Sequence, residues 1–272
     1  MSIIAIARLE LLIARRNMWV ATSLILMGLF SSVLTLAGGA PTGTLGVDPL
    51  LVAITSITTL SVYLVPLIGL LLSFDSISGE AERGTLALSL TYPLSRGEIL
   101  LGKFIAHLLV LGFAVAVGLA LTAGLTIWQY GAADLSYMPL LKLFATSLAL
   151  GAAFLGIGYG VSAQSRQTST ASGIAIIVWL VAVVLYDLGL LGALVADGGG
   201  YFTKTLFPWF LIASPADAFR LINMPLETVS TLASGLGAAG PTVGIAGPLV
   251  SLALWPVAAL IMAWLAFRRV EP

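Results

Sequence analysis

Few residues in this chain have the type and spacing that catalysis, phosphate binding or metal binding requires. Residues 97–103 follow the phosphate-binding pattern G-x-x-x-x-G-K-[ST], in which backbone amides and the lysine hold phosphate oxygens. The last position, which should supply a hydroxyl to magnesium, is Phe104, and the stretch opens an apolar run instead of following a buried strand. We therefore expect no nucleotide site here. We interpret Gly102 as a packing position and Lys103 as an anchor at the membrane interface.

A second candidate is Tyr186-Asp187, a pair that intramembrane aspartyl proteases also carry inside an apolar run. Those enzymes need a second aspartate in a G-x-G-D motif, because their chemistry depends on two carboxylates that share one proton. The nearest match in this chain, residues 235–237, is followed by Ala238. We therefore predict no catalytic residue, and an intramembrane hydrolase is kept only as the alternative from another class.

The sulfur and imidazole side chains are few. The chain has no cysteine, one histidine and six scattered methionines. This composition excludes a thiolate cluster or a multi-histidine metal site within one chain, and it offers no methionine ladder for copper(I). The single histidine, His107, lies one helical turn after Lys103, so both side chains share a face near the membrane interface. His107 is either a pH- or substrate-sensing group or a side chain hydrogen-bonded to a neighbouring helix.

The candidate residues Lys103, His107 and Asp187 all lie in apolar runs that predict helices. Hydrophobic residues make up 59% of the 272 residues, charged residues only 9%, and mean hydropathy is +1.09. Zero net charge argues against a nucleic-acid partner. A helix that crosses a bilayer needs about 20 apolar residues. The sequence predicts an all-α polytopic membrane protein with six such helices, at 18–38, 50–74, 99–127, 139–163, 171–196 and 247–267.

Lysine and arginine divide unevenly between the two sides of these spans. Nine of the twelve fall on the side of the two termini and three on the other, so the positive-inside rule predicts that both termini are cytoplasmic. Residues 1–17 are expected to form an amphipathic helix in the inner interface, with a cytoplasmic extension of the first span as the alternative. Residues 18–272 are expected to form one six-helix domain, in which residues 197–246 include a long outer segment on or dipping into the outer leaflet.

Small residues recur at four-residue spacing in two of the spans. Such stripes let helices approach closely. Packing within the bundle is the favoured interpretation, and a dimer seam is the alternative. The residues are Ala116, Ala120 and Gly124 in the third span, and Ala152, Gly156 and Gly160 in the fourth.

The predicted cytoplasmic loop between the second and third spans, residues 75–98, holds six charged side chains. Its pattern predicts a short charged helix, a break at Gly84, an apolar helix over 85–90 and a stop at Pro93. The leucines here need a partner surface, because so short a loop cannot bury them itself; a hairpin lying on lipid is the alternative. They are Leu86, Leu88, Leu90 and Leu94.

Three motifs of this region carry a resemblance to a known family. They are E-x-x-x-G-T-L at residues 80–86, P-L-S-R at residues 93–96 and G-K-F at residues 102–104. Together with six spans and cytoplasmic termini, they resemble the integral-membrane subunits of type-2 ABC exporters, also called type V ABC transporters. This family resemblance extends over most of the chain.

Four segments are similar to a subgroup of that family, the permeases that serve maturation of nitrous oxide reductase. They are residues 65–75, 90–94, 101–104 and 214–223, although Ser214 stands where we expect asparagine. The resemblance implies a permease of the bacterial inner membrane that pairs with a second copy of itself within the lipid bilayer. It also implies a separate cytoplasmic ATPase dimer, which binds ATP and magnesium, and a periplasmic right-handed β-helix protein. The chain itself would hold no cofactor, and the complex would assist assembly of a copper–sulfur centre.

The resemblance also implies roles for individual side chains. The loop would supply a coupling helix that contacts the ATPase, and the outer segment would dock the periplasmic protein, with Asp217 and Arg220 paired on one helix face. The expected ATPase-coupling residues are Asp75, Glu80, Glu82, Arg83, Thr85, Leu86 and Arg96. The expected docking residues are Trp209, Asp217, Phe219, Arg220 and Asn223.

The residues leave open what the complex moves. One possibility is export of a substrate such as a sulfur species, and another is transmission of force to the periplasmic protein without solute movement. A generic exporter of lipids, peptides or drugs is the alternative within the same class. A structural membrane anchor would not associate with an ATPase.

Overall fold

The computed structural model describes residues 3–14, 16–38, 49–87, 94–131, 138–223 and 244–270. Within these ranges all regular elements are helices. Six of the described helical segments are long and apolar enough to cross a membrane, which confirms the six predicted spans to within a few residues at most boundaries. They are Met18–Ala37, Val52–Glu82, Arg96–Gln129, Met138–Gln164, Thr168–Asp197 and Ala246–Arg268.

The spanning segments are built from longer and shorter helices. The fifth span combines α9 (Thr168–Trp179), a π-helical turn η1 (Leu180–Leu185) and α10 (Tyr186–Asp197). The other long helices are α2 (Met18–Gly38), α4 (Pro49–Ser73), α7 (Arg96–Tyr130), α8 (Met138–Gln164) and α15 (Ala246–Arg268). The short ones are α1 (Ile3–Ala14), α5 (Ser78–Glu82), η2 (Phe202–Leu206), α11 (Phe207–Ala213) and α12 (Pro215–Asn223).

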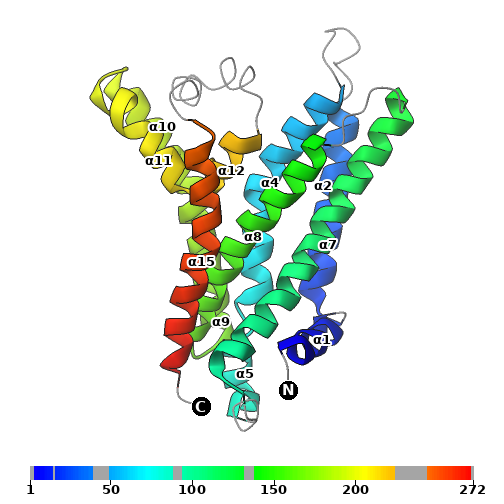
Figure 1. Ribbon diagram of the computed structural model, residues 1–272, viewed down its shortest axis with the longest axis vertical. Coiled ribbons are helices and arrows are strands. Elements are labelled where there is room, and N and C mark those ends of the chain that lie inside the picture. The colour runs from blue at the N-terminus through cyan, green and yellow to red at the C-terminus, as the bar shows by residue number, and fades with distance from the viewer. Residues whose placement is uncertain are drawn as a thin grey trace.

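The short helices gather at the two ends of the bundle (Figure 1). Helices α1 and α5 lie at the end where α15 finishes, which we call the proximal end. Helices α11 and α12 and the end of α10 lie at the other, distal end. Helix α1 is separate from α2 and lies across the bundle axis rather than extending the first span. Several of its exposed side chains are apolar, including Ile4, Leu9 and Leu12, as suits a helix in contact with lipid.

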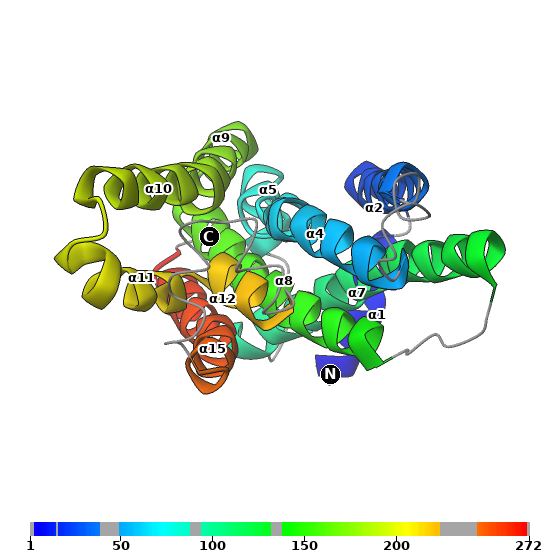
Figure 2. The same ribbon diagram turned by 90° about the horizontal axis from the view of Figure 1, so that it is seen from above.

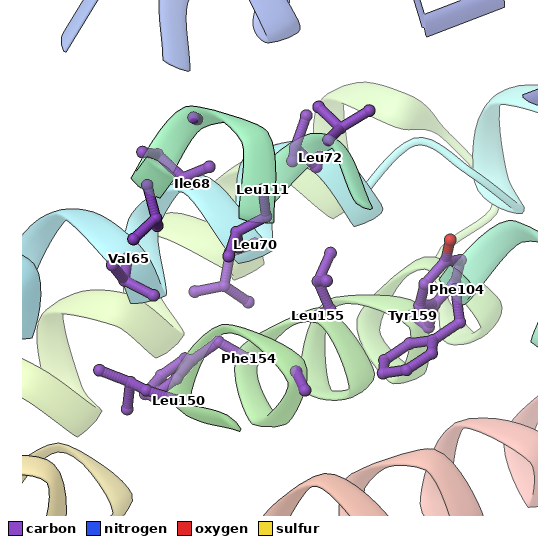
Figure 3. Packing of buried hydrophobic residues seen from close by; sticks show 14 of the residues in the cluster. Val65, Ile68, Leu70, Leu72, Phe104, Leu111, Leu150, Phe154, Leu155 and Tyr159 are labelled. Carbon is purple, nitrogen blue, oxygen red and sulfur yellow. The ribbon is translucent and has the colours of Figure 1, made fainter. Parts of the chain in front are cut away.

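Helix α8 is the centre of the bundle. It packs between α4 and α15, while α7 packs against α1 and α2 on the other side (Figure 2). The side chains of Phe154, Leu155 and Tyr159 on α8 are fully buried. In Figure 3, Leu155 lies between α8 and the α4 residues Leu70 and Leu72, and Tyr159 lies beside Phe104 of α7. Because this interior is apolar, the few polar groups placed in it need partners of their own.

The N-terminus of α7 is fixed by a capping box. The hydroxyl of Ser95 accepts the backbone N–H of Glu98, and the Glu98 carboxylate accepts the backbone N–H of Ser95 at 2.8 Å. Two of the amides that a helix start leaves unpaired are satisfied in this way. Arg96 therefore begins a well-defined helix at the proximal end.

The distal end is formed by a chain that turns back after the fifth span. The η2 turn and α11 run beside α10, and after a break at Ser214 helix α12 packs against α4, α8 and α15. Helix α12 is not one of the six spans, yet most of its side chains are buried. The segment expected at the outer leaflet thus enters the bundle. Residues 224–243 lie outside the described part of the chain.

The small residues of the fourth span serve packing within the chain. A Cβ atom added at Gly156 would lie 2.7 Å from the Cβ of Ala259 on α15. In the third span, a Cβ added at Gly124 would meet no atom within 4 Å. The favoured interpretation is therefore confirmed for Gly156, and a dimer seam along the third span stays a prediction.

We expect Gly156→Ala to destabilise the protein by about 1–3 kcal/mol, because α8 and α15 would have to separate to admit a methyl group. Thermal unfolding of the purified protein in detergent measures this effect. Gly124→Ala is the matched control and should leave the melting temperature equal or slightly higher. Equal effects of the two substitutions would contradict the close approach of α8 and α15.

Candidate functional site

The segment between α4 and α7 has the form that its sequence predicts. Helix α4 ends at Ser73, the five-residue helix α5 follows, and the chain reverses at Gly84, whose φ of 71° is in the left-handed region that favours glycine. Thr85 to Ala87 are helical again. The short charged helix and the break at Gly84 are confirmed, whereas the predicted stop at Pro93 and the residues 88–93 lie outside the described ranges.

Helix α5 and the turn before it form hydrogen bonds with two spanning helices. The hydroxyl oxygen of Ser162 on α8 accepts the backbone N–H groups of Ile77 and Ser78 at 2.9 and 3.0 Å. The Glu82 carboxylate accepts the backbone N–H and the hydroxyl of Thr168, the first residue of α9. A carboxylate at this position satisfies an unpaired amide and the positive end of the helix dipole. Helix α5 therefore has fixed contacts with α8 and α9.

Lys103 of α7 lies between two carboxylates. Its ammonium contacts Glu10 of α1 and lies 2.8 Å from Oε1 of Glu80 on α5. The side chains of Lys103, Glu10 and Glu80 are 6%, 12% and 19% exposed. The expectation that Lys103 reaches the lipid headgroups is corrected, because partners within the chain are closer and the side chain is buried. This group, which we call the Lys103 cluster, joins α1, α5 and α7.

His107 lies one turn further along α7 and is also buried rather than at the membrane interface. Its Nδ1 is 2.6 Å from the hydroxyl of Tyr159 on α8, and the two rings stack with centroids 5.9 Å apart. The contact favours the interpretation of His107 as a side chain hydrogen-bonded to a neighbouring helix. It adds a polar contact between α7 and α8 beside the Lys103 cluster.

The side chains expected to contact an ATPase divide into exposed and enclosed groups. Glu82, Arg83 and Thr85 are exposed at the proximal end, whereas Leu86 is 1% exposed and belongs to the core of the bundle. The expectation that Leu86 needs an external partner is therefore corrected, because the spanning helices themselves bury it. Asp75 is half-buried.

Arg96 has a role inside the chain. Its Nη1 donates hydrogen bonds to the carbonyl oxygens of Phe267 and Val270 at 2.6 Å each. These carbonyls lie at the C-terminus of α15, where helix groups are left without partners and the dipole favours a cation. Arg96 thus links the start of α7 to the end of α15.

Residues 97–103 lie within α7. A phosphate-binding loop holds phosphate through backbone N–H groups that curve around the anion. In a continuous helix, most of these groups are directed along the axis and bonded to the preceding turn. The helical geometry of this stretch agrees with its interpretation as the start of a spanning helix.

A second charged group lies at the distal end. Arg220 of α12 donates through Nη1 to Asp217 at 2.8 Å and through Nη2 to Asp187 of α10, also at 2.8 Å. The expected pairing of Asp217 with Arg220 is confirmed, but it lies inside the bundle: Asp217 is 1% exposed and Phe219 is fully buried. Of the five expected docking residues, Trp209 is the one with a largely exposed side chain, at 70%.

The position of Asp217 close to Asp187 was not expected from the sequence. Asp217 comes from α12, 30 residues later in the chain, and not from a G-x-G-D motif. Burial and the nearby Asp187 carboxylate raise the pKa of Asp217 to about 7, against the lowering effect of Arg220. Oδ2 of Asp217 is buried without a hydrogen-bond partner. Arg220 binds an oxygen of each carboxylate, so the arrangement is an ion-pair cluster rather than a dyad open to water and substrate.

Helix α12 is also bonded to the central helix. The Nδ2 of Asn223 donates to the hydroxyl of Thr146 on α8 at 2.9 Å. The same α8 binds the α4–α5 turn through Ser162 at its other end. With a rise of 1.5 Å per residue, Thr146 and Ser162 are about 24 Å apart along one helix. A single rigid element thus contacts the short helices of both ends.

Several partners in these contacts carry no signature in sequence. Glu10, Ser162 and Thr168 belong to no motif, and only the presence of Glu10 in an otherwise apolar face of α1 hints at a buried cation nearby. Asp187 is a charge inside an apolar run, and such residues regularly have a partner on another helix. Its partner is Arg220, which lies 33 residues away.

Comparisons with known proteins agree with the geometry. Residues 4–271 match the ABC-2 family of transporter proteins. The chain is 38% identical to a protein of Pseudomonas aeruginosa named probable ABC transporter permease protein NosY, with 97% of each chain covered. It is 36% identical to a protein of the same name from Stutzerimonas stutzeri, again with 97% of each chain covered.

We expect Lys103→Met to destabilise the protein by about 3–5 kcal/mol, because it leaves the Glu10 and Glu80 carboxylates buried without a cation. Thermal unfolding in detergent measures the loss. The triple variant Lys103→Met/Glu10→Gln/Glu80→Gln should recover most of the stability. Lys204→Met removes an exposed lysine and is the control. A loss in Lys103→Met no larger than in the control would refute the Lys103 cluster.

Proposed function

The chain belongs to the ABC-2 family of transporter permeases, and on that premise we propose that it serves maturation of nitrous oxide reductase. In this proposal it is a multi-pass subunit of the bacterial inner membrane that assists assembly of the copper–sulfur centre. Similarity to two NosY permeases over 97% of the chain supports the assignment, together with the resemblance of residues 65–75 and 214–223. The chain has no cysteine and one histidine, so we propose that it moves other components and does not carry copper.

The proposed partners at the proximal end are a second copy of the chain and a NosF-like ATPase dimer that binds ATP and magnesium. In this proposal the proximal end faces the cytoplasm, in accord with the excess of lysine and arginine on that side. The exposed side chains of Arg83 and Thr85 are available for contact with the ATPase. Glu80 and Glu82 are already bonded within the chain, so their contribution would be to hold α5 in place.

The observation that carries the proposal is the set of bonds between α5 and the spanning helices. The Lys103 cluster joins α5 to α1 and α7, Ser162 joins the preceding turn to α8, and Glu82 joins α5 to α9. A push on α5 by an ATPase is therefore transmitted to four helices at once. Helix α8 carries the displacement about 24 Å to Thr146, which is bonded to α12.

At the distal end the proposed partner is a NosD-like periplasmic β-helix protein. Trp209 of α11 is the exposed aromatic side chain among the residues expected to dock it, and exposed tryptophans often anchor protein interfaces. Displacement of α12 would reach this surface through α11, which packs against it. Force transmission and export of a sulfur species are the two outputs that this path can serve.

We expect Arg83→Glu to weaken association with the ATPase by about ten-fold or more, because it reverses an exposed charge at the proposed interface. Co-purification with the ATPase measures association, and absorbance of the copper–sulfur centre measures maturation; both should fall. Lys204→Glu, an exposed reversal at the distal end, should leave ATPase association intact. Full maturation of nitrous oxide reductase in cells that lack this chain would overturn the proposed function.

We expect Trp209→Ala to reduce binding of the β-helix protein by about ten-fold or more, since truncation of an interface tryptophan commonly costs 2 kcal/mol or more. Pull-down of the periplasmic protein with the intact complex measures this loss. Trp128→Ala is the matched control. Trp128 is 77% exposed and lies on α7, near the distal end of the bundle. Equal binding by both variants would place the docking surface elsewhere.

A further inference from the structure

A groove of about 850 Å³ lies at the proximal end. Three segments line it: residues 81–87, residues 163–166 at the turn between α8 and α9, and residues 262–270 at the end of α15. The groove thus separates the segment that carries α5 from the last spanning helix. Arg96 bonds the carbonyls of α15 at Phe267 and Val270, which fixes this wall of the groove.

Two arginines give the groove its charge. Arg166 and Arg269 both line it and are exposed, and neither forms an ion pair with a carboxylate of the described residues. No aspartate or glutamate is among the described residues that line the groove. The nearby Glu82 is bonded to Thr168, and the C-terminal carbonyls of α15 are bonded to Arg96, so neither competes for these guanidinium groups. The site therefore has positive charge and free donors for an anion.

The other wall of the groove is apolar and continues along a spanning helix. Met262 and Leu265 of α15 line the groove and are 53% and 46% exposed. Leu265 and Met262 precede Arg269 by about one and two helical turns, so a long ligand held by the arginine can lie against both. An acidic protein segment would engage the arginines but would gain little from exposed apolar side chains on a membrane helix. A ligand with a charged head and a hydrocarbon chain satisfies both walls.

We propose that this groove binds an anionic phospholipid, with the phosphate between Arg166 and Arg269 and an acyl chain along Met262 and Leu265. The bound lipid contacts the 81–87 segment, the α8–α9 turn and α15, the three segments that line the groove. Its placement in the inner leaflet rests on the orientation given in the proposed function. The charge and apolar surface that recognise it do not depend on that orientation.

Lipid titration of the purified complex with its ATPase tests the site. Native mass spectrometry counts phosphatidylglycerol bound to the wild type and to Arg166→Gln/Arg269→Gln, with phosphatidylcholine as the neutral probe. We expect affinity of the variant for phosphatidylglycerol to fall about 25-fold, from about five-fold for each arginine lost. Phosphatidylcholine binding should be unchanged. Melting temperatures in phosphatidylcholine should agree, because neither arginine has a bonded partner in the described chain.

The matched control is Arg8→Gln/Arg16→Gln, which removes two exposed arginines at the same end but outside the groove. It should retain phosphatidylglycerol binding within about two-fold. Equal loss in both double variants would reduce the effect to general charge attraction and overturn the site. Retained lipid binding with loss of the ATPase in the groove variant would assign the groove to the ATPase instead. Full maturation of nitrous oxide reductase in cells that lack the chain, with lipid binding by the purified complex intact, would count against the proposed function and not against this site.

Discussion

A charged side chain inside a membrane-spanning bundle needs an opposite charge within reach, and the rest of this structure depends on how Lys103 meets that requirement. Its ammonium cannot be solvated where it lies, so α1 supplies Glu10 and α5 supplies Glu80. Helix α1 also packs its apolar face against α7, whereas α5 is only five residues long. One buried cation therefore decides where the N-terminal helix and the exposed loop helix lie relative to α7.

At the distal end, a second buried cation is also paired with two carboxylates. Arg220 lies between Asp187 and Asp217 and holds α12 against the fifth span, just as Lys103 holds α1 and α5 against the third. In both clusters one cation binds two carboxylates, and at least one member comes from a helix that does not cross the membrane. The π-helical turn η1 immediately precedes Tyr186 and Asp187, and such turns shift the side chains that follow them. The two clusters make the short helices parts of the bundle rather than loose attachments.

The central helix gives these two ends a common frame. Helix α8 is close-packed along its length, with Gly156 against Ala259 and the fully buried Phe154 and Tyr159 in the interior. A close-packed interior is rigid, so displacement at Ser162 cannot be absorbed by empty space before it reaches Thr146. Such an architecture suits the proposed transmission of motion from an ATPase partner. The groove beside Arg166 and Arg269 adds a place where the surrounding lipid can act on that motion.

The class of the protein, its six spans, the short helix before Gly84 and the ABC-2 family could all be predicted from the sequence, because each depends on local composition or on contiguous motifs. The span boundaries follow from about 20 apolar residues per crossing, and the break at Gly84 follows from a backbone angle that glycine tolerates best. The partners of the charged side chains could not be predicted in this way and became known from the folded bundle. Glu80, Asp217 and Arg220 look like surface residues in sequence, yet each is enclosed by helices distant along the chain. Periodicity reports the face of a helix on which a residue lies. The neighbour that covers that face depends on the packing of the whole bundle.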